Sequence, residues 1–140
     1  MKTLSMLLCS SALMLVLQAH SCNKHKPEHP STCGDIACTM MFAMVTVEVK
    51  DNAGTPVVLD EYYTIREKNG EKITSQSHNP ESGTYVVLDD GFISTLTNKR
   101  ESFRFIGKKS GAEVVNEMYD ISGDCCHVNK ESGKSTITIP

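Results

Sequence analysis

The amino-acid sequence predicts an all-β domain, an antiparallel β-sandwich of about seven strands. Three observations lead to this prediction. Short apolar or alternating stretches recur along the chain, turns containing Gly and Asn separate them about every 10–15 residues, and no stretch has the period of an amphipathic helix. Together these features are typical of a sandwich or barrel. The expected strands are residues 39–50, 57–66, 72–76, 84–89, 101–108, 113–121 and 135–139.

The first half of the domain contains the clearest strand. Val45, Val47 and Val49 alternate with polar residues, which predicts a half-buried strand over 39–50. Residues 40–44 are apolar on both faces, so we expect both faces of the strand to be buried at this end. The inward residues expected in the next strand are Val57, Leu59, Tyr63 and Ile65. An Asn-Gly turn then leads to a short polar stretch at 72–76, which we expect at a sheet edge.

The second half continues the pattern. Residues 84–89 are apolar on both faces and therefore predict a central strand, whereas 92–96 fits a short helix or a strand equally well. Phe103 and Phe105 alternate with polar residues in the strand over 101–108. A turn is expected at 129–134. The inward residues expected in the terminal strand are Ile137 and Ile139.

Residues 1–21 have the layout of a signal peptide, in which Lys2 precedes an apolar run and small residues end it. The run is shorter than the ~20 apolar residues that cross a bilayer. Removal of this leader takes one of 14 basic residues and none of the 17 acidic ones, which leaves a net charge of −4. The sequence has neither a basic cluster nor a basic stripe, and this argues against a nucleic-acid partner.

Ser21-Cys22-Asn23-Lys24 resembles the processing site of bacterial lipoproteins, especially the Bacteroidetes type. The resemblance implies that Cys22 becomes the N-terminus and carries a lipid, which anchors the protein to the bacterial outer membrane or cell surface. Ordinary cleavage after Ala19-His20-Ser21 is the alternative. Lipidation leaves four of the six cysteines to pair, whereas ordinary cleavage leaves an odd one, so the count favours the lipoprotein. Residues 22–37 are then the lipidated end and tether, and 38–140 form the domain.

A second resemblance covers about a third of the chain. The strand, Asp-x-x-Gly-x-Pro turn and strand at 47–57, followed by Gly83-Thr84-Tyr85-Val86-Val87, resemble the carboxypeptidase-regulatory or prealbumin-like repeat of exported bacterial proteins. This implies an Ig-like or prealbumin-like sandwich. The segment 124–128 is similar to uncharacterised Bacteroidetes lipoproteins, a group that implies no activity.

Four cysteines remain after lipidation, two near residue 35 and two near residue 125, and exported thiols normally pair. A bond between the neighbours Cys125 and Cys126 would be strained, so we expect both to pair with Cys33 and Cys38, in either of two connectivities. The first such bond closes a loop of ~90 residues, which loop-closure entropy values at about 4–5 kcal/mol. A zinc site of Cys33, Cys38, Cys126 and His127 is the alternative. A redox enzyme is disfavoured, because Cys-x-x-Cys is absent.

The sequence contains no phosphate-binding loop, zinc-protease motif or nucleophile elbow, so we expect no enzyme and no cofactor. We expect an envelope-anchored binding or structural module, whose partner is an envelope protein or a glycan. The runner-up is a small exported hydrolase with an acidic site at Asp89, Asp90 and His78.

Overall fold

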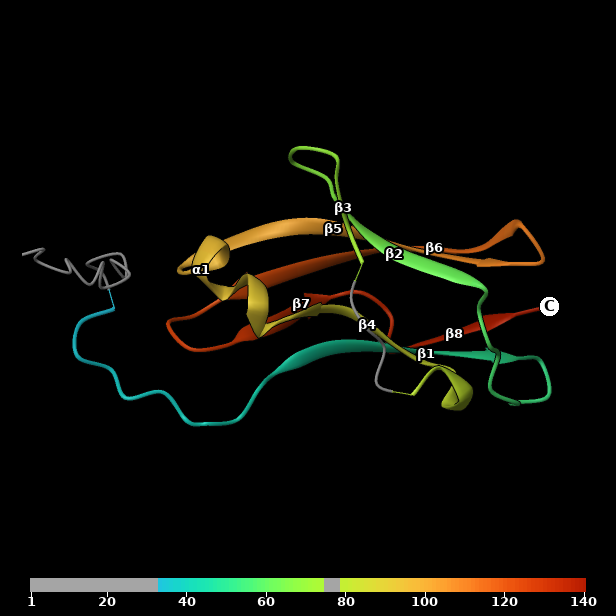
Figure 1. Cartoon of the computed structure of the whole chain (residues 1–140), viewed down its shortest axis with the longest axis horizontal. Helices are drawn as coiled ribbons and strands as arrows, with labels where there is room; N and C mark the ends of the chain where they lie inside the picture. The colour runs from blue at the N-terminus through green and yellow to red at the C-terminus, as the bar shows by residue number, and fades with distance from the viewer. Residues whose placement is uncertain (1–32, 75–78) are drawn as a thin grey trace, which may run out of the picture.

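A computed structural model describes residues 33–74 and 79–140. The predicted signal peptide, Cys22, most of the predicted tether and His78 lie outside these residues. The described residues form a mostly-β domain of two sheets, which confirms the predicted fold class. Figure 1 shows the two sheets as the layers of a sandwich-like structure.

The first sheet has three strands in the order β4-β1-β8. Their bounds are β1 Met44–Asp51, β4 Thr84–Asp89 and β8 Thr136–Ile139. β1 pairs antiparallel with β4 but parallel with β8, which is a departure from the fully antiparallel arrangement expected. The chain crosses from one sheet to the other between β7 and β8. β4 is buried as predicted, but it is an edge strand and not a central one.

The second sheet has five strands in the order β3-β2-β5-β6-β7, all of them antiparallel to their neighbours. Their bounds are β2 Glu61–Arg66, β3 Glu71–Ile73, β5 Lys99–Lys109, β6 Ala112–Gly123 and β7 Val128–Ser132. The short strand β3 lies at the edge, as predicted. The turn predicted at 129–134 is wrong, because most of it is β7, an edge strand whose residues 129–132 are all exposed and so lack any apolar alternation.

Three short helices complete the described part of the chain: η1 Pro80–Ser82, η2 Asp90–Phe92 and α1 Ile93–Leu96. The last two settle the ambiguous stretch at 92–96 as helical. α1 contacts β5 and β6, and its one buried residue is Leu96. Gly123 lies against this helix, where a Cβ would come 2.7 Å from the Leu96 carbonyl oxygen. Within the described residues, none of the helices is long and apolar enough to cross a bilayer.

The core lies between the sheets. Val45, Val47 and Val49 are buried on one face of β1, as the alternation predicts. The opposite sheet contributes Phe103 and Phe105, which also face inward as predicted. The remaining buried apolar residues of the main cluster are Val57, Leu59, Ile73, Tyr85, Val87, Leu88, Leu96, Val115, Tyr119, Ile121, Val128, Ile137 and Ile139.

The inward face of β2 was predicted wrongly. Thr64, directly opposite Phe105 in the sheet, is buried, whereas Tyr63 and Ile65 are only half-buried. The Thr64 hydroxyl donates a hydrogen bond of 2.7 Å to the Val87 carbonyl on the facing sheet. The Lys72 ammonium lies 3.9 Å from the centre of the Tyr63 ring. A threonine whose hydroxyl is satisfied across the sandwich therefore takes the place that an apolar residue was expected to fill.

The start of the first strand was also predicted wrongly. β1 begins at Met44, and residues 39–42 are exposed and lie outside any strand. Met40, Met41 and Phe42 are 104%, 76% and 61% exposed. In Figure 1 this part of the chain leaves β1 and curves around one end of the molecule. We call residues 39–43, between Cys38 and β1, the apolar arm.

Candidate functional site

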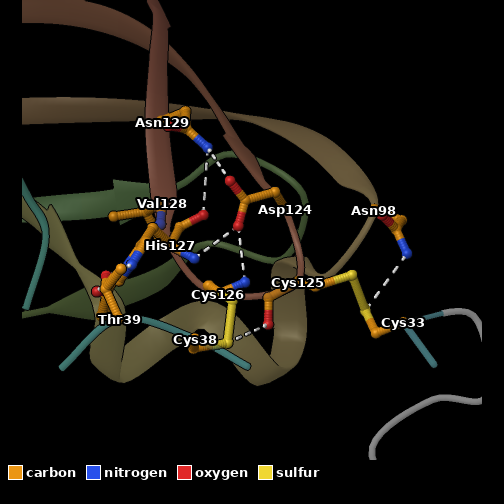
Figure 2. Close-up of a disulfide and its surroundings, with 11 residues drawn as sticks. Cys33, Cys38, Thr39, Asn98, Asp124, Cys125, Cys126, His127, Val128 and Asn129 are labelled. Carbon is orange, nitrogen blue, oxygen red and sulfur yellow. Dashed lines mark hydrogen bonds and ion pairs between the residues drawn. A yellow bond between two sulfur atoms is a disulfide. The ribbon is translucent and has the colours of Figure 1, made fainter. Parts of the chain in front are cut away.

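A pair of disulfides fixes the N-terminal segment to the domain. Cys33 is bonded to Cys125 and Cys38 to Cys126, with Cα–Cα distances of 5.6 and 5.4 Å. Both bonds join the N-terminal segment to the turn between β6 and β7, as expected, and the structure selects one of the two connectivities left open (Figure 2). Covalent attachment to the domain begins at Cys33, inside the predicted tether.

Asp124 shapes the turn that presents the two neighbouring cysteines. Its Oδ1 accepts hydrogen bonds from the backbone N–H groups of Cys126 and His127, both at 2.7 Å. Its Oδ2 accepts one from the Asn129 side chain at 3.1 Å. The N–H of Cys126, then that of His127, lowers the pKa of Asp124 below its usual range. Figure 2 shows Asp124 beside this turn, with its carboxylate directed to the backbone of Cys126 and His127.

His127 joins three segments that are distant in the sequence. Its Nδ1 lies 2.7 Å from Oδ2 of Asp90, and its Nε2 lies 2.9 Å from Oγ1 of Thr39. The disulfide between Cys38 and Cys126 lies one residue before each of these partners, Thr39 and His127. The covalent bond therefore brings the threonine hydroxyl to the imidazole.

Asp90 is the centre of this polar network. Its side chain is only 8% exposed, and it also accepts hydrogen bonds from the N–H groups of Ala43, at 2.7 Å, and Val128, at 2.8 Å. Burial by itself would raise the pKa of Asp90, but the Ala43 N–H, the imidazole and the Val128 N–H outweigh burial, and the pKa falls below its usual value. Asp90 is thus a buried carboxylate, and both of its oxygens have hydrogen-bond partners.

The zinc alternative does not match this arrangement. All four sulfur atoms are in disulfides, so they supply no thiolate ligands. Within residues 33–74 and 79–140, no group of three or more His, Cys, Asp or Glu side chains could hold a metal ion.

Of the three residues expected in the acidic site of the runner-up hydrolase, the structure describes Asp89 and Asp90, whose carboxylates have different partners. Asp89 Oδ1 accepts a hydrogen bond from the Gly91 N–H at 2.9 Å, which begins the helical turn after β4. Asp90 points to His127 instead. His78 lies outside the described residues. The partner of Asp90 was missed in the sequence because 37 residues separate the two.

A groove of about 530 Å³ lies beside the N-terminal half of β1. It holds one acidic and one basic side chain, and both have partners. Glu48 pairs with Lys50 at 2.7 Å, and the Lys130 ammonium contacts the Ser135 hydroxyl. The lining residues are Met44, Val45, Thr46 and Glu48 of β1, Val128, Asn129 and Lys130 of β7, Ser135 just before β8, and Thr136 of β8.

Fold and site together define a mostly-β, two-sheet domain whose N-terminal segment is fixed by two disulfides to the turn between β6 and β7. Two disulfides indicate an oxidising, extracytoplasmic location. Comparison with known protein families, with curated proteins and with solved structures finds no match.

Proposed function

We propose that this chain is an envelope lipoprotein, anchored through Cys22, whose β-sandwich is a binding or structural module that contacts an envelope component through the apolar arm. One observation carries the proposal. The described residues expose seven large hydrophobic side chains, and five of them lie between residues 36 and 44. Exposed apolar residues that gather in this way mark interaction sites more often than scattered ones do.

The remaining finer assignments belong to the same proposal. A prealbumin-like sandwich is supported by the turn after β1, where Asp51 Oδ1 accepts hydrogen bonds from the N–H groups of Ala53 and Thr55 at 2.9 and 2.8 Å. The Asp-x-x-Gly-x-Pro stretch is thus a tight turn, as the resemblance implies. The outer membrane or cell surface is supported by the disulfides together with the residues around Cys22.

The anchor is tested by the mass of the N-terminal peptide and by fractionation of cells that produce the full chain. The protein should carry lipid on Cys22 and sediment with membranes, and Cys22→Ser should release it. Cys9→Ser is the matched control, since that cysteine leaves with the leader and its loss should change nothing. An unlipidated wild-type N-terminus would refute the anchor.

The contact surface is tested by a photoactivatable residue placed at Met41, with Met118 as the matched control. Both methionines are exposed, but Met118 lies on β6, away from the arm in sequence. We expect adducts with envelope components from position 41 and none from position 118. Equal labelling from both positions would refute a specific contact at the arm.

A hydrolase is the second candidate, because of one arrangement in the structure. Thr39, His127 and Asp90 follow one another by hydrogen bonds in the order of a nucleophile, a general base and an orienting acid. It ranks second because the same bonds hold the arm in place. A fluorophosphonate probe distinguishes the hydrolase from the binding module. Labelling at position 39 that is seen in wild type and in Thr39→Ser but is lost in Thr39→Val would establish the hydrolase, whereas a binding module stays unlabelled.

A further inference from the structure

The apolar arm is held at both ends. At its start the disulfide between Cys38 and Cys126 fixes the chain, and at its end Ala43 and Asp90 exchange two hydrogen bonds. The Ala43 N–H donates to Asp90 Oδ2 at 2.7 Å, and the Asp90 N–H donates to the Ala43 carbonyl at 3.1 Å. The apolar side chains between these points are therefore presented at a lower ordering cost than a free loop would have on binding.

The arm lies close in sequence to the proposed anchor, on which this inference rests. Eleven peptide links separate Cys22 from Cys33. Even when fully extended, such a segment spans at most ~40 Å, so a lipid on Cys22 keeps the arm near the membrane surface. Under that condition a second, weak contact becomes effectively intramolecular, and a few apolar side chains are enough.

We infer that the envelope component met by the apolar arm is the lipid bilayer itself. Met40, Met41 and Phe42 insert at the boundary between headgroups and acyl chains and act as a second membrane contact beside the anchor. The lipid surface is the partner that the anchor always places within reach. The contact orients the domain, with the disulfide end toward the membrane.

The backbone of the arm sets the depth of insertion. Among the described residues, the N–H groups of Met40, Met41 and Phe42 have no hydrogen-bond acceptor. Such groups are costly in hydrocarbon but are satisfied by water among the headgroups, so the arm enters shallowly.

The charge of the protein indicates which force holds the arm. The proposed mature chain has 13 basic and 17 acidic residues, and the arm itself is uncharged. Attraction to anionic lipid therefore contributes little, and apolar contact must supply the affinity. Insertion should occur in zwitterionic vesicles and persist at high salt.

The chain contains no tryptophan, which makes a tryptophan in the arm a clean reporter. We would produce the full chain as Phe42→Trp, purify the processed protein and reconstitute it in phosphatidylcholine vesicles with brominated acyl chains. The emission of the introduced indole should shift to the blue and be quenched about twofold or more, as for a side chain at the acyl boundary. Val58→Trp is the matched control, because Val58 is an exposed apolar residue elsewhere on the domain, and the emission of that variant should not change.

The outcomes separate this inference from the proposed anchor. Absence of lipid on Cys22 refutes the anchor alone. The arm is then tested with protein that carries both Cys22→Ser and Phe42→Trp, to which the same vesicles are added in excess. Quenching of the indole in that preparation supports insertion. The inference is overturned if the indole at position 42 is unquenched in both preparations, if high salt abolishes quenching, or if the blue shift requires envelope proteins, which would make the partner a protein.

Discussion

His127 Nδ1 lies 2.7 Å from Asp90 Oδ2, although 37 residues separate them in the sequence. This contact gives His127 a structural role. Together with the hydrogen bond between its Nε2 and Thr39, it ties the helical turn after β4 to the apolar arm and to the disulfide turn. The carboxylate of Asp90 then fastens the far end of the arm at Ala43.

The two disulfides should stabilise the fold in a non-additive way. They close loops of 92 and 88 residues, so the first bond formed contributes about 4–5 kcal/mol. Once one is present, the other closes only the short path between the two bridges and adds about 2 kcal/mol. Urea unfolding of Cys33→Ser/Cys125→Ser, Cys38→Ser/Cys126→Ser and the fourfold variant checks this. A fourfold variant whose loss equals only the sum of the two pairwise losses would contradict it.

Asp90→Asn should lower the free energy of unfolding by about 1–3 kcal/mol at neutral pH, because an amide nitrogen cannot accept all the hydrogen bonds that the carboxylate receives. The pKa of Asp90 is lowered in the folded state, so its contribution is present above the ordinary carboxyl pKa and is lost as the pH falls through the folded-state pKa. Unfolding at several pH values should show wild type and variant converging in acid. Asp35→Asn, at an exposed site, is the control. If wild type and Asp90→Asn differ in free energy of unfolding by the same amount at every pH, the charged carboxylate is not the source of the stabilisation.

Thr64→Val should destabilise the domain by about 1–2 kcal/mol, although it keeps the side-chain shape, because the Val87 carbonyl loses its hydroxyl donor in a buried position. Chemical denaturation measures the effect. Thr46→Val on the exposed face of β1 is the matched control and should stay within about 0.5 kcal/mol of wild type. A stabilised Thr64→Val protein would show that the hydrogen bond across the sandwich contributes nothing.

Gly133→Ala should cost about 2–4 kcal/mol, from a backbone φ of 110° together with a Cβ that would overlap the Tyr119 ring. The ring is held in place, since the Tyr119 hydroxyl donates to the Lys134 carbonyl at 2.7 Å. Gly111→Ala isolates the backbone part, because its φ is 77° but its Cβ would meet nothing within 4 Å. Thermal unfolding of both variants should show the larger loss at position 133, and equal losses would refute the steric contribution.

Local patterns in the sequence were sufficient where a single strand has one buried face. The valines of β1, the phenylalanines of β5 and the isoleucines of β8 all face the core as predicted. The same reasoning failed at Thr64 and at β7. A buried hydroxyl with a partner on the facing sheet, and an edge strand exposed on both faces, leave no apolar alternation to read.

The sequence alone determined the fold class, the inward faces of the patterned strands, and that the N-terminal cysteines should bond to the pair near the C-terminus. Periodicity and the pairing of exported thiols are properties that composition and spacing express directly. Only the tertiary structure decided which cysteines pair, that Asp90 meets His127, and that Met40, Met41 and Phe42 lie outside the core. These outcomes depend on contacts between segments about 40 to 90 residues apart, among them the disulfide and the hydrogen bonds that fix the two ends of the apolar arm.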